Sequence, residues 1–235
     1  MKHFQIAYIA ILAAITLLFQ SGCDKHGQDR QVIKFTCDNT FDALVSHDGA
    51  VFANQLSAES LDYYTRTLKL SLTAKKAEVQ ALPLHQRYEV LLTRLLGKRA
   101  ELKDLDGKAF AEWSVNNGLW DYIPEPPEDL SLGHLTFTET DAIGKLTATV
   151  QRTLRSRRFG SRTVERQQST SHTVRFVLEN GQWKYDNTAY NRSIEAEIKA
   201  YVKDTKGDEN AALLELLGEI TDRTIPPTIW NGMLH

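Results

Sequence analysis

The spacing of apolar residues changes at a proline-rich segment of this chain. Residues 123–130 read IPEPPEDL, with three prolines within four residues. Proline fixes φ and lacks a backbone N–H, so a helix does not continue through such a segment. Before it, apolar residues recur every three or four positions, as in an amphipathic helix; after it they alternate with polar residues, as in a half-buried strand. Helices followed by antiparallel strands predict an α+β fold.

Residues 35–118 are predicted to be helical. Ser57 precedes the segment AESLDYY, where its hydroxyl is suited to cap a helix and Glu59 to stabilise the first turn. A second helix is expected to end at Gly97, and a third to cover residues 108–116. The apolar stripes of the first two helices are Leu61, Tyr64, Leu68 and Leu72, and then Tyr88, Leu91, Leu92, Leu95 and Leu96.

Three later segments alternate apolar and polar residues and are predicted to be strands. Their inward positions are Leu135 and Phe137, then Leu146, Ala148 and Val150, then Val174, Phe176 and Leu178. Asn180-Gly181 favours a two-residue hairpin turn before Trp183, because both residues tolerate positive φ. The helical period returns after Tyr190, with apolar faces at Ile194, Ile198, Tyr201 and Val202, and at Leu213, Leu216, Leu217 and Ile220. The final IPPTIW segment is expected to be extended.

Two of these segments resemble a known superfamily. SAESLDYYTRTLKLSLTA (57–74) and VRFVLENGQWKYD (174–186) are similar to the helix and the closing hairpin of nuclear transport factor 2-like domains, also called the cystatin-like cone. In that family, N-terminal helices pack in the concave face of a curved antiparallel sheet. The resemblance implies a cone-like α+β domain over residues 34–190. Residues 191–235 would form a helical C-terminal extension that the basic family fold lacks.

Residues 1–22 have the layout of a secretory signal peptide. Lys2 supplies a positive charge, residues 6–19 form an apolar run, and two small residues precede Cys23. The run is shorter than the ~20 residues that span a bilayer comfortably. An uncleaved signal anchor remains the alternative.

The small residues and Cys23 resemble the end of the bacterial lipoprotein box, although Gln20 stands where that family usually has an aliphatic residue. In the family, the cysteine receives a diacylglyceryl thioether and becomes the new N-terminus. The resemblance implies lipidation at Cys23, a hydrophilic tether up to residue 33 and a body on the extracytoplasmic face of the membrane. Asp24 also resembles the enterobacterial signal for retention in the inner membrane.

The chain has two cysteines, so lipid on Cys23 would leave Cys37 without a partner of its own kind. We expect Cys37 to be buried as a small hydrophobic residue in that case. The alternative is cleavage by an ordinary signal peptidase, followed by a Cys23–Cys37 disulfide in a soluble periplasmic protein.

Charge and motifs limit the possible chemistry. Removal of residues 1–22 would leave 27 basic residues against 30 acidic ones, which argues against a general nucleic-acid binder. No two histidines are three or four residues apart, and the chain has neither a glycine-rich phosphate loop nor a G-x-S-x-G motif. We therefore expect no cofactor, no metal site and no nucleophile. An acid/base enzyme of the cone fold would have Asp62, Tyr63, Tyr64 and His134 to draw on, but an ordinary structural role is the better interpretation of each.

Six arginines and one acid, Glu165, occupy the stretch from Arg152 to Arg166, around Gly160. If Gly160 marks a hairpin tip, these guanidinium groups gather at one end of the sheet. Arginine suits phosphate and carboxylate recognition because its donors form a fork. The candidate anion- or partner-binding residues, nearest the tip, are Arg155, Arg157, Arg158 and Arg162. For an anchored protein, anionic lipid head groups are one such target. The alternative is a solvated strand edge that charge protects from aggregation.

The sequence thus favours a membrane-anchored cell-envelope lipoprotein with a non-catalytic module that binds a protein or a small ligand. One alternative is a cavity acid/base enzyme of the same fold, of the isomerase or dehydratase type. Another is a soluble or signal-anchored periplasmic protein.

Overall fold

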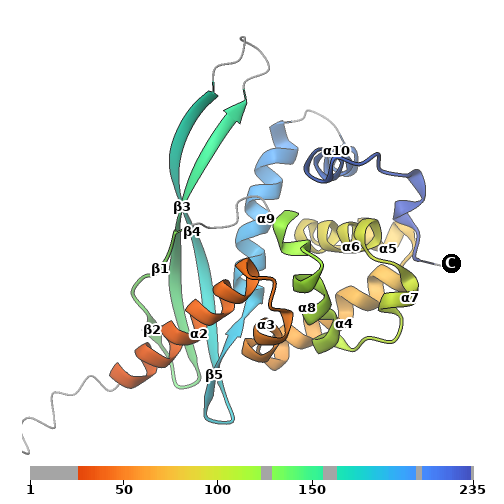
Figure 1. The fold of residues 1–235 in the computed structure, drawn as a ribbon. Helices are drawn as coiled ribbons and strands as arrows, with labels where there is room; N and C mark the ends of the chain where they lie inside the picture. Colours follow the sequence, from red (N-terminus) through yellow and green to blue (C-terminus); the bar gives the residue numbers. More distant parts are fainter. Residues whose placement is uncertain (1–25, 123–128, 156–162, 205–207, 234–235) are drawn as a thin grey trace, which may run out of the picture.

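The computed structural model describes residues 26–122, 129–155, 163–204 and 208–233. These residues form an α+β fold in which helices come first, an antiparallel sheet follows and further helices end the chain (Figure 1). The change of apolar period at residues 123–130 therefore predicted the fold class correctly.

The N-terminal part is helical throughout. Its elements are α2 (Gly27–Val45), α3 (Gly49–Gln55), α4 (Ala58–Thr73), α5 (Lys76–Gln80), α6 (Leu84–Leu96), α7 (Arg99–Leu102), α8 (Gly107–Asn116) and the 3-10 turn η1 (Leu119–Tyr122). The strands are β1 (Asp129–Leu132), β2 (Thr136–Phe137), β3 (Asp141–Arg155), β4 (Thr163–Glu179) and β5 (Gln182–Asp186). The chain ends with α9 (Asn187–Asp204), α10 (Glu209–Thr221) and the 3-10 turn η2 (Pro227–Trp230).

The three predicted N-terminal helices are confirmed, and their ends have the expected local causes. The Ser57 hydroxyl accepts a hydrogen bond from the Ser60 N–H at 3.1 Å, which caps α4. Gly97 follows the last residue of α6. The Asp106 carboxylate caps α8 by accepting from the Ala109 N–H at 2.8 Å.

The sheet has the hydrogen-bonded order β1-β3-β4-β5, with β2 also paired to β3, and every pairing is antiparallel. β1 pairs with β3 only as far as Thr149, and β5 pairs with β4 only over residues 175–179. Residues 150–155 and 163–168 therefore continue as a two-stranded extension, called the arm below, beyond the other strands (Figure 1).

The predicted hairpin turn is present between β4 and β5. Asn180 has φ 52° and Gly181 has φ 79°, so both central residues take the left-handed conformation that this dipeptide tolerates. Phe176 and Trp183 are buried, as expected, but Leu178 is 38% exposed. Leu178 pairs with Trp183 next to the turn, at the tip of the hairpin.

The predicted tether is helical from Gly27 onward. The Trp183 indole donates to Asp29 at 2.9 Å, and the His26 ring stacks on Phe137 with centroids 4.2 Å apart. Ile33 is completely buried. The polar residues that predicted a tether instead pack the start of α2 against the sheet.

The C-terminal residues are part of the main body. α9 begins at Asn187, so the predicted boundary between residues 190 and 191 falls inside a helix. Arg94 of α6 donates to the backbone oxygens of Leu70, Ala74 and Ile229 at 2.8, 2.7 and 3.1 Å, which joins the end of α4 to η2. The last segment also contains a 3-10 turn and is not fully extended.

An ion network joins the sheet to the helical layer. Arg175 of β4 donates to Asp186 at 2.6 Å, to Asp141 at 3.0 Å and to Glu59 at 3.1 Å. Asp186 has no exposed side-chain surface and also accepts from the Thr188 N–H at 2.9 Å and the Thr188 hydroxyl at 2.7 Å. With the Ser60 hydroxyl, which donates at 3.5 Å, this buried carboxylate has one cation and three further donors around it in the described structure.

Candidate functional site

Four of the five residues predicted to carry lipid or to bind an anion lie outside the described part of the chain. Cys23, Arg157, Arg158 and Arg162 all belong to the segments that are not described. Arg155 is the last residue of β3, paired with Thr163. Among the described residues, no helix combines the length and the apolarity needed to cross a bilayer.

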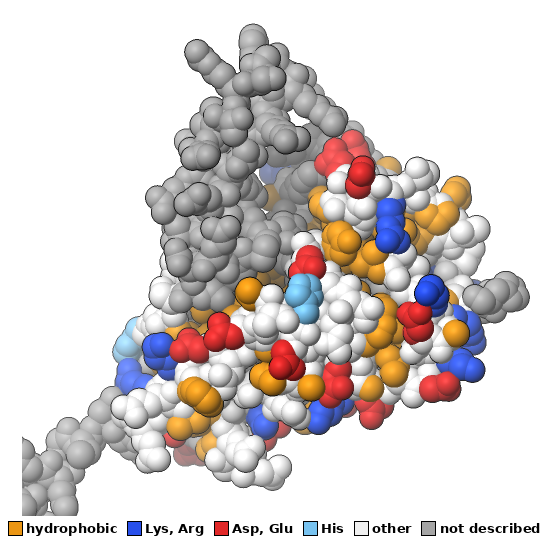
Figure 2. All heavy atoms as spheres, in the orientation of Figure 1, with side chains coloured by type: hydrophobic (Ala, Val, Ile, Leu, Met, Phe, Trp, Pro, Cys, Tyr) orange, Lys and Arg blue, Asp and Glu red, His pale blue; other side chains and the backbone are white. Residues whose placement is uncertain are grey.

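The ladder of the arm pairs two arginines. Arg152 of β3 stands opposite Arg166 of β4, and Thr153 stands opposite Glu165. Over the face of the helical layer seen in Figure 2, basic and acidic side chains are interspersed. The stretch from Arg152 to Arg166 has far more basic than acidic residues. The visible face of the helical layer shows no such excess.

The four residues considered for acid/base chemistry lie in different surroundings. Asp62 and His134 are exposed, and Tyr64 belongs to the aromatic core, where it contacts Phe52 and Phe110 edge-on. Tyr63 is 7% exposed and donates its hydroxyl to Glu89 at 2.6 Å. Tyr63 is therefore the one member of the group that contacts a second ionisable residue in a cavity wall.

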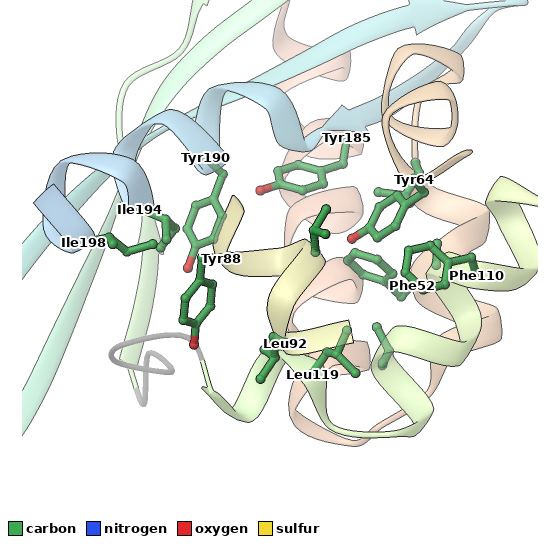
Figure 3. Close-up of a cluster of buried hydrophobic side chains, with 14 of the residues drawn as sticks. Phe52, Tyr64, Tyr88, Leu92, Phe110, Leu119, Tyr185, Tyr190, Ile194 and Ile198 are labelled. Carbon is green, nitrogen blue, oxygen red and sulfur yellow. The ribbon is translucent and has the colours of Figure 1, made fainter. Parts of the chain in front are cut away.

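That cavity lies between α4, α6, α8 and η1. Figure 3 shows Tyr64, Leu92, Phe110 and Leu119 converging from these four elements. The full lining is Tyr64, Thr67, Tyr88, Glu89, Leu92, Thr93, Phe110, Ser114, Leu119 and Trp120. The empty space between these side chains, up to the solvent opening, is about 390 Å³. The centre of a water-sized sphere can occupy about 30 Å³ of this space.

Glu89 gives this cavity its electrostatic character. Burial raises the pKa of Glu89 to about 7, and the hydrogen bond from Tyr63 offsets only part of that effect. Burial also holds the pKa of Tyr63 well above its ordinary value, with the Glu89 charge adding to the effect. Among the described residues that line the cavity, Glu89 alone ionises below the range of a phenol, and none of the others is a Lys, Arg or His.

Three hydroxyl side chains, Thr67, Thr93 and Ser114, add to the polar part of the wall, and that of Ser114 already donates to the Ala111 carbonyl at 2.8 Å. Thr93 has no exposed surface, and its Oγ1 has no hydrogen-bond partner within the described parts of the chain. Thr67 Oγ1 also makes no hydrogen bond of normal geometry, although its proximity lowers the pKa of Tyr63 slightly. A buried hydroxyl without a partner is costly, so Thr93 in particular indicates a polar occupant.

A second polar layer lies behind Tyr63. His85 stacks against the Tyr63 ring, with centroids 6.2 Å apart, and pairs with Glu195 at 2.7 Å. Glu195 pairs in turn with Lys199 at 2.5 Å. These contacts bring α9 against the outer side of Tyr63 and hold its ring in place.

The inward face of the sheet, in contrast, is filled by core side chains. Ala142, Val174 and Phe176 are fully buried, and Leu146 and Tyr185 are 1% exposed. Phe41 of α2 contacts the Tyr185 ring edge-on at 5.8 Å between centroids. Cys37, on the same helix, is 2% exposed, and burial raises the pKa of its thiol to about 12. The thiol is thus buried as expected.

Sequence reasoning did not single out Glu89. A charged residue inside the apolar run YEVLL, between Tyr88 and Val90, was the available signal. It remained ambiguous because the buried face of α6 depends on contacts with α4 and α8, which the period of one helix does not define.

Comparison with known proteins identifies no relative. No family model matches the chain, and searches of curated proteins and of solved structures give no match.

Proposed function

We propose that the chain is a lipid-anchored cell-envelope protein that binds an acidic partner through the arginine-rich end of the arm. The observation that carries the proposal is the pairing of Arg152 with Arg166. Like charges at directly paired positions weaken a ladder, so this arrangement favours a role other than stability. An acidic surface would neutralise these two residues together with Arg155, Arg157, Arg158 and Arg162.

The anchor and the start of α2 determine where the arm would lie. Three peptide steps separate Cys23 from His26, a span of at most about 11 Å. His26 stacks on Phe137, so a lipid on Cys23 would hold the body close to the membrane. α2 starts at the opposite end of the molecule from the free end of the arm (Figure 1). This arrangement favours an acidic envelope protein over the lipid head groups around the anchor.

A cone-like arrangement of the body is part of the proposal. α2 packs on the sheet, as N-terminal helices do in the cystatin-like cone, and α9, which follows the sheet, packs on it as well. Core residues such as Phe176 and Tyr185 are buried on the inward face of the sheet. A filled face supports a binding module that uses its outer surface, because an enzyme of that family needs an open cavity there.

Metabolic labelling tests the anchor. Cells that express the full chain are fed a palmitate analogue, and the wild type is expected to take up the label. Cys23→Ala is expected to lose the label and to accumulate as a larger precursor. Equal labelling of the variant would contradict lipidation at Cys23.

Crosslinking in cells tests the arm. The variant changes Arg155, Arg157, Arg158 and Arg162 to Gln. A matched control removes the same charge from exposed residues of the helical layer, by changing Arg66, Lys69, Lys76 and Lys108 to Gln. We expect the crosslink to the partner to be lost in the arm variant alone and to decrease when the salt concentration is raised before crosslinking, since screening weakens contacts between exposed charges. Equal loss in both variants would mean that only net charge matters.

An acid/base enzyme is the second candidate, and Glu89 favours it. A carboxyl group with a pKa of about 7 beside a phenol is suited to proton transfer at neutral pH. Exchange of α-protons for deuterium in a panel of small carbonyl compounds, followed by NMR in D₂O, tests this activity. If the wild type catalyses the exchange and Glu89→Gln does not, the result supports an acid/base enzyme. Equal exchange rates in the two proteins would exclude Glu89 as the catalytic base.

A further inference from the structure

The cavity around Glu89 is not used by the arm, and its lining has an uneven chemistry. When ionised, Glu89 carries the single formal charge among the described residues that line the cavity. Tyr63 already donates to one of its oxygens, which leaves the other oxygen for a different donor. Anions do not fit this lining, because it presents a carboxylate and no Lys, Arg or His side chain.

The remaining groups favour an occupant with several N–H donors. The Thr93 hydroxyl is fully buried, lines the same cavity as Glu89 and lies four residues after it on α6, which places the two side chains on one face of the helix. Thr67 adds a hydroxyl from α4. The Ser114 hydroxyl donates to the Ala111 carbonyl, and the other described lining residues are aromatic or aliphatic, with Tyr64, Tyr88, Phe110 and Trp120 as the rings. Aromatic rings stabilise a nearby cation and also accept an alkyl chain.

We propose that this cavity binds the primary ammonium group of a small alkylamine. Its three N–H donors would go to the Glu89 carboxylate, to Thr93 Oγ1 and to Thr67 Oγ1, and the short alkyl chain would contact the aromatic wall. The open space of about 30 Å³ corresponds to roughly two water molecules, which suits a head group of a few non-hydrogen atoms.

Other occupants satisfy the wall less well. Water can pair with Thr93 but leaves the charge of Glu89 without a counter-ion. Calcium and magnesium require six or more oxygen ligands, and the described residues contain no cluster of three His, Cys, Asp or Glu side chains able to hold a metal. A quaternary ammonium is bulkier than a primary one and has no N–H for the two threonines.

The test measures thermal stability and calorimetric binding of the purified full-length chain in detergent. The probe is ethylammonium chloride, and the controls are sodium chloride at equal ionic strength, tetramethylammonium chloride and ethanol. We expect ethylammonium alone to bind saturably and to raise the melting temperature. Absence of saturable binding at millimolar ethylammonium would overturn the proposal, as would equal binding of tetramethylammonium.

Two variants assign the binding to this cavity. Glu89→Gln keeps the shape of the side chain and is expected to abolish binding. Thr93→Val keeps its volume and is expected to weaken binding about tenfold, the usual effect of losing a hydrogen bond to a charged group. Thr188→Val, which lies outside the cavity, is the control and is expected to bind as the wild type does. If Glu89→Gln does not fold, Thr93→Val alone decides, because unchanged affinity in that variant contradicts the proposal.

The arm plays no part in this experiment, so the cavity proposal can fail or succeed independently of the proposed function.

Discussion

Asp186, where the sheet meets the helices, is fully buried, and Glu89, in the helical layer, is partly buried, and the two carboxyl groups have different surroundings. Asp186 accepts from Arg175 at 2.6 Å and from two groups of Thr188. Glu89 accepts from Tyr63 at 2.6 Å, and burial raises its pKa to about 7. Burial of a charge is tolerated where a cation and further donors surround it, as around Asp186.

The difference separates a structural site from a candidate ligand site. The Arg175 network links β3, β4, β5 and α4, so its loss should loosen the contact between the sheet and the helical layer. The Glu89 cavity has room for an occupant, and the Thr93 hydroxyl in its wall has no hydrogen-bond partner among the described residues. The first acid should therefore stabilise the fold, whereas the second should destabilise the free protein when it is ionised.

The largest effect is expected for Asp186→Asn. The change leaves Arg175 without its closest carboxylate and places an amide next to the donors of Thr188. Loss of one partner of a buried pair costs about 3 kcal/mol or more of unfolding free energy, reduced here because Arg175 is 31% exposed. Urea unfolding measures the change. The matched control is Glu59→Gln, whose side chain is 55% exposed and should cost less than about 1 kcal/mol. Equal losses in the two variants would remove the distinction between the buried and the exposed partner.

The next effect is the pH dependence that Glu89 gives the free protein. Its pKa rises from an ordinary 4.5 to about 7 on folding, so between these values the folded state binds more protons than the unfolded state. The contribution of Glu89 to unfolding free energy should therefore fall as pH rises from 4.5 to 7, by at most about 3 kcal/mol in total. Glu89→Gln should remove this decline and be more stable than the wild type at pH 8. If the unfolding free energies of the two proteins change in parallel with pH, Glu89 is solvated in the folded state.

The smallest effect compares two threonines. Thr188→Val removes one hydroxyl donor from Asp186 and should cost about 1 kcal/mol of unfolding free energy. Thr93→Val removes a hydroxyl that has no partner in the described structure, so in the ligand-free protein it should change the unfolding free energy by less than about 0.5 kcal/mol or increase it. Urea unfolding of both variants at one pH makes the comparison. A greater loss in Thr93→Val would mean that its hydroxyl is already satisfied in the free protein.

The features that the sequence predicted well depend on neighbouring residues. The capping hydroxyl of Ser57, the end of α6 before Gly97 and the turn at Asn180-Gly181 are all local, and the structure contains each of them. The change of period at residues 123–130 likewise needs no knowledge of tertiary contacts.

The features that the sequence did not reveal depend on contacts between distant segments. The start of α2 was predicted as a tether because the residues that hold it, Phe137 and Trp183, lie more than a hundred positions away. The site at Glu89 needs α4, α6, α8 and η1 together, so no single period identifies it. The predicted sites at Cys23 and at the tip of the arm remain predictions, since they lie in or next to segments outside the described residues.

The most direct measurement is the pKa of Glu89 itself. Its side-chain carboxyl carbon can be followed by ¹³C NMR as the pH changes, and Glu89→Gln identifies the resonance. We predict a midpoint near pH 7 in the free protein and a lower midpoint in saturating ethylammonium, because a bound cation favours the ionised carboxylate. A midpoint near 4.5 in the free protein, unchanged by ethylammonium, would place the carboxyl in water and contradict the contrast with Asp186.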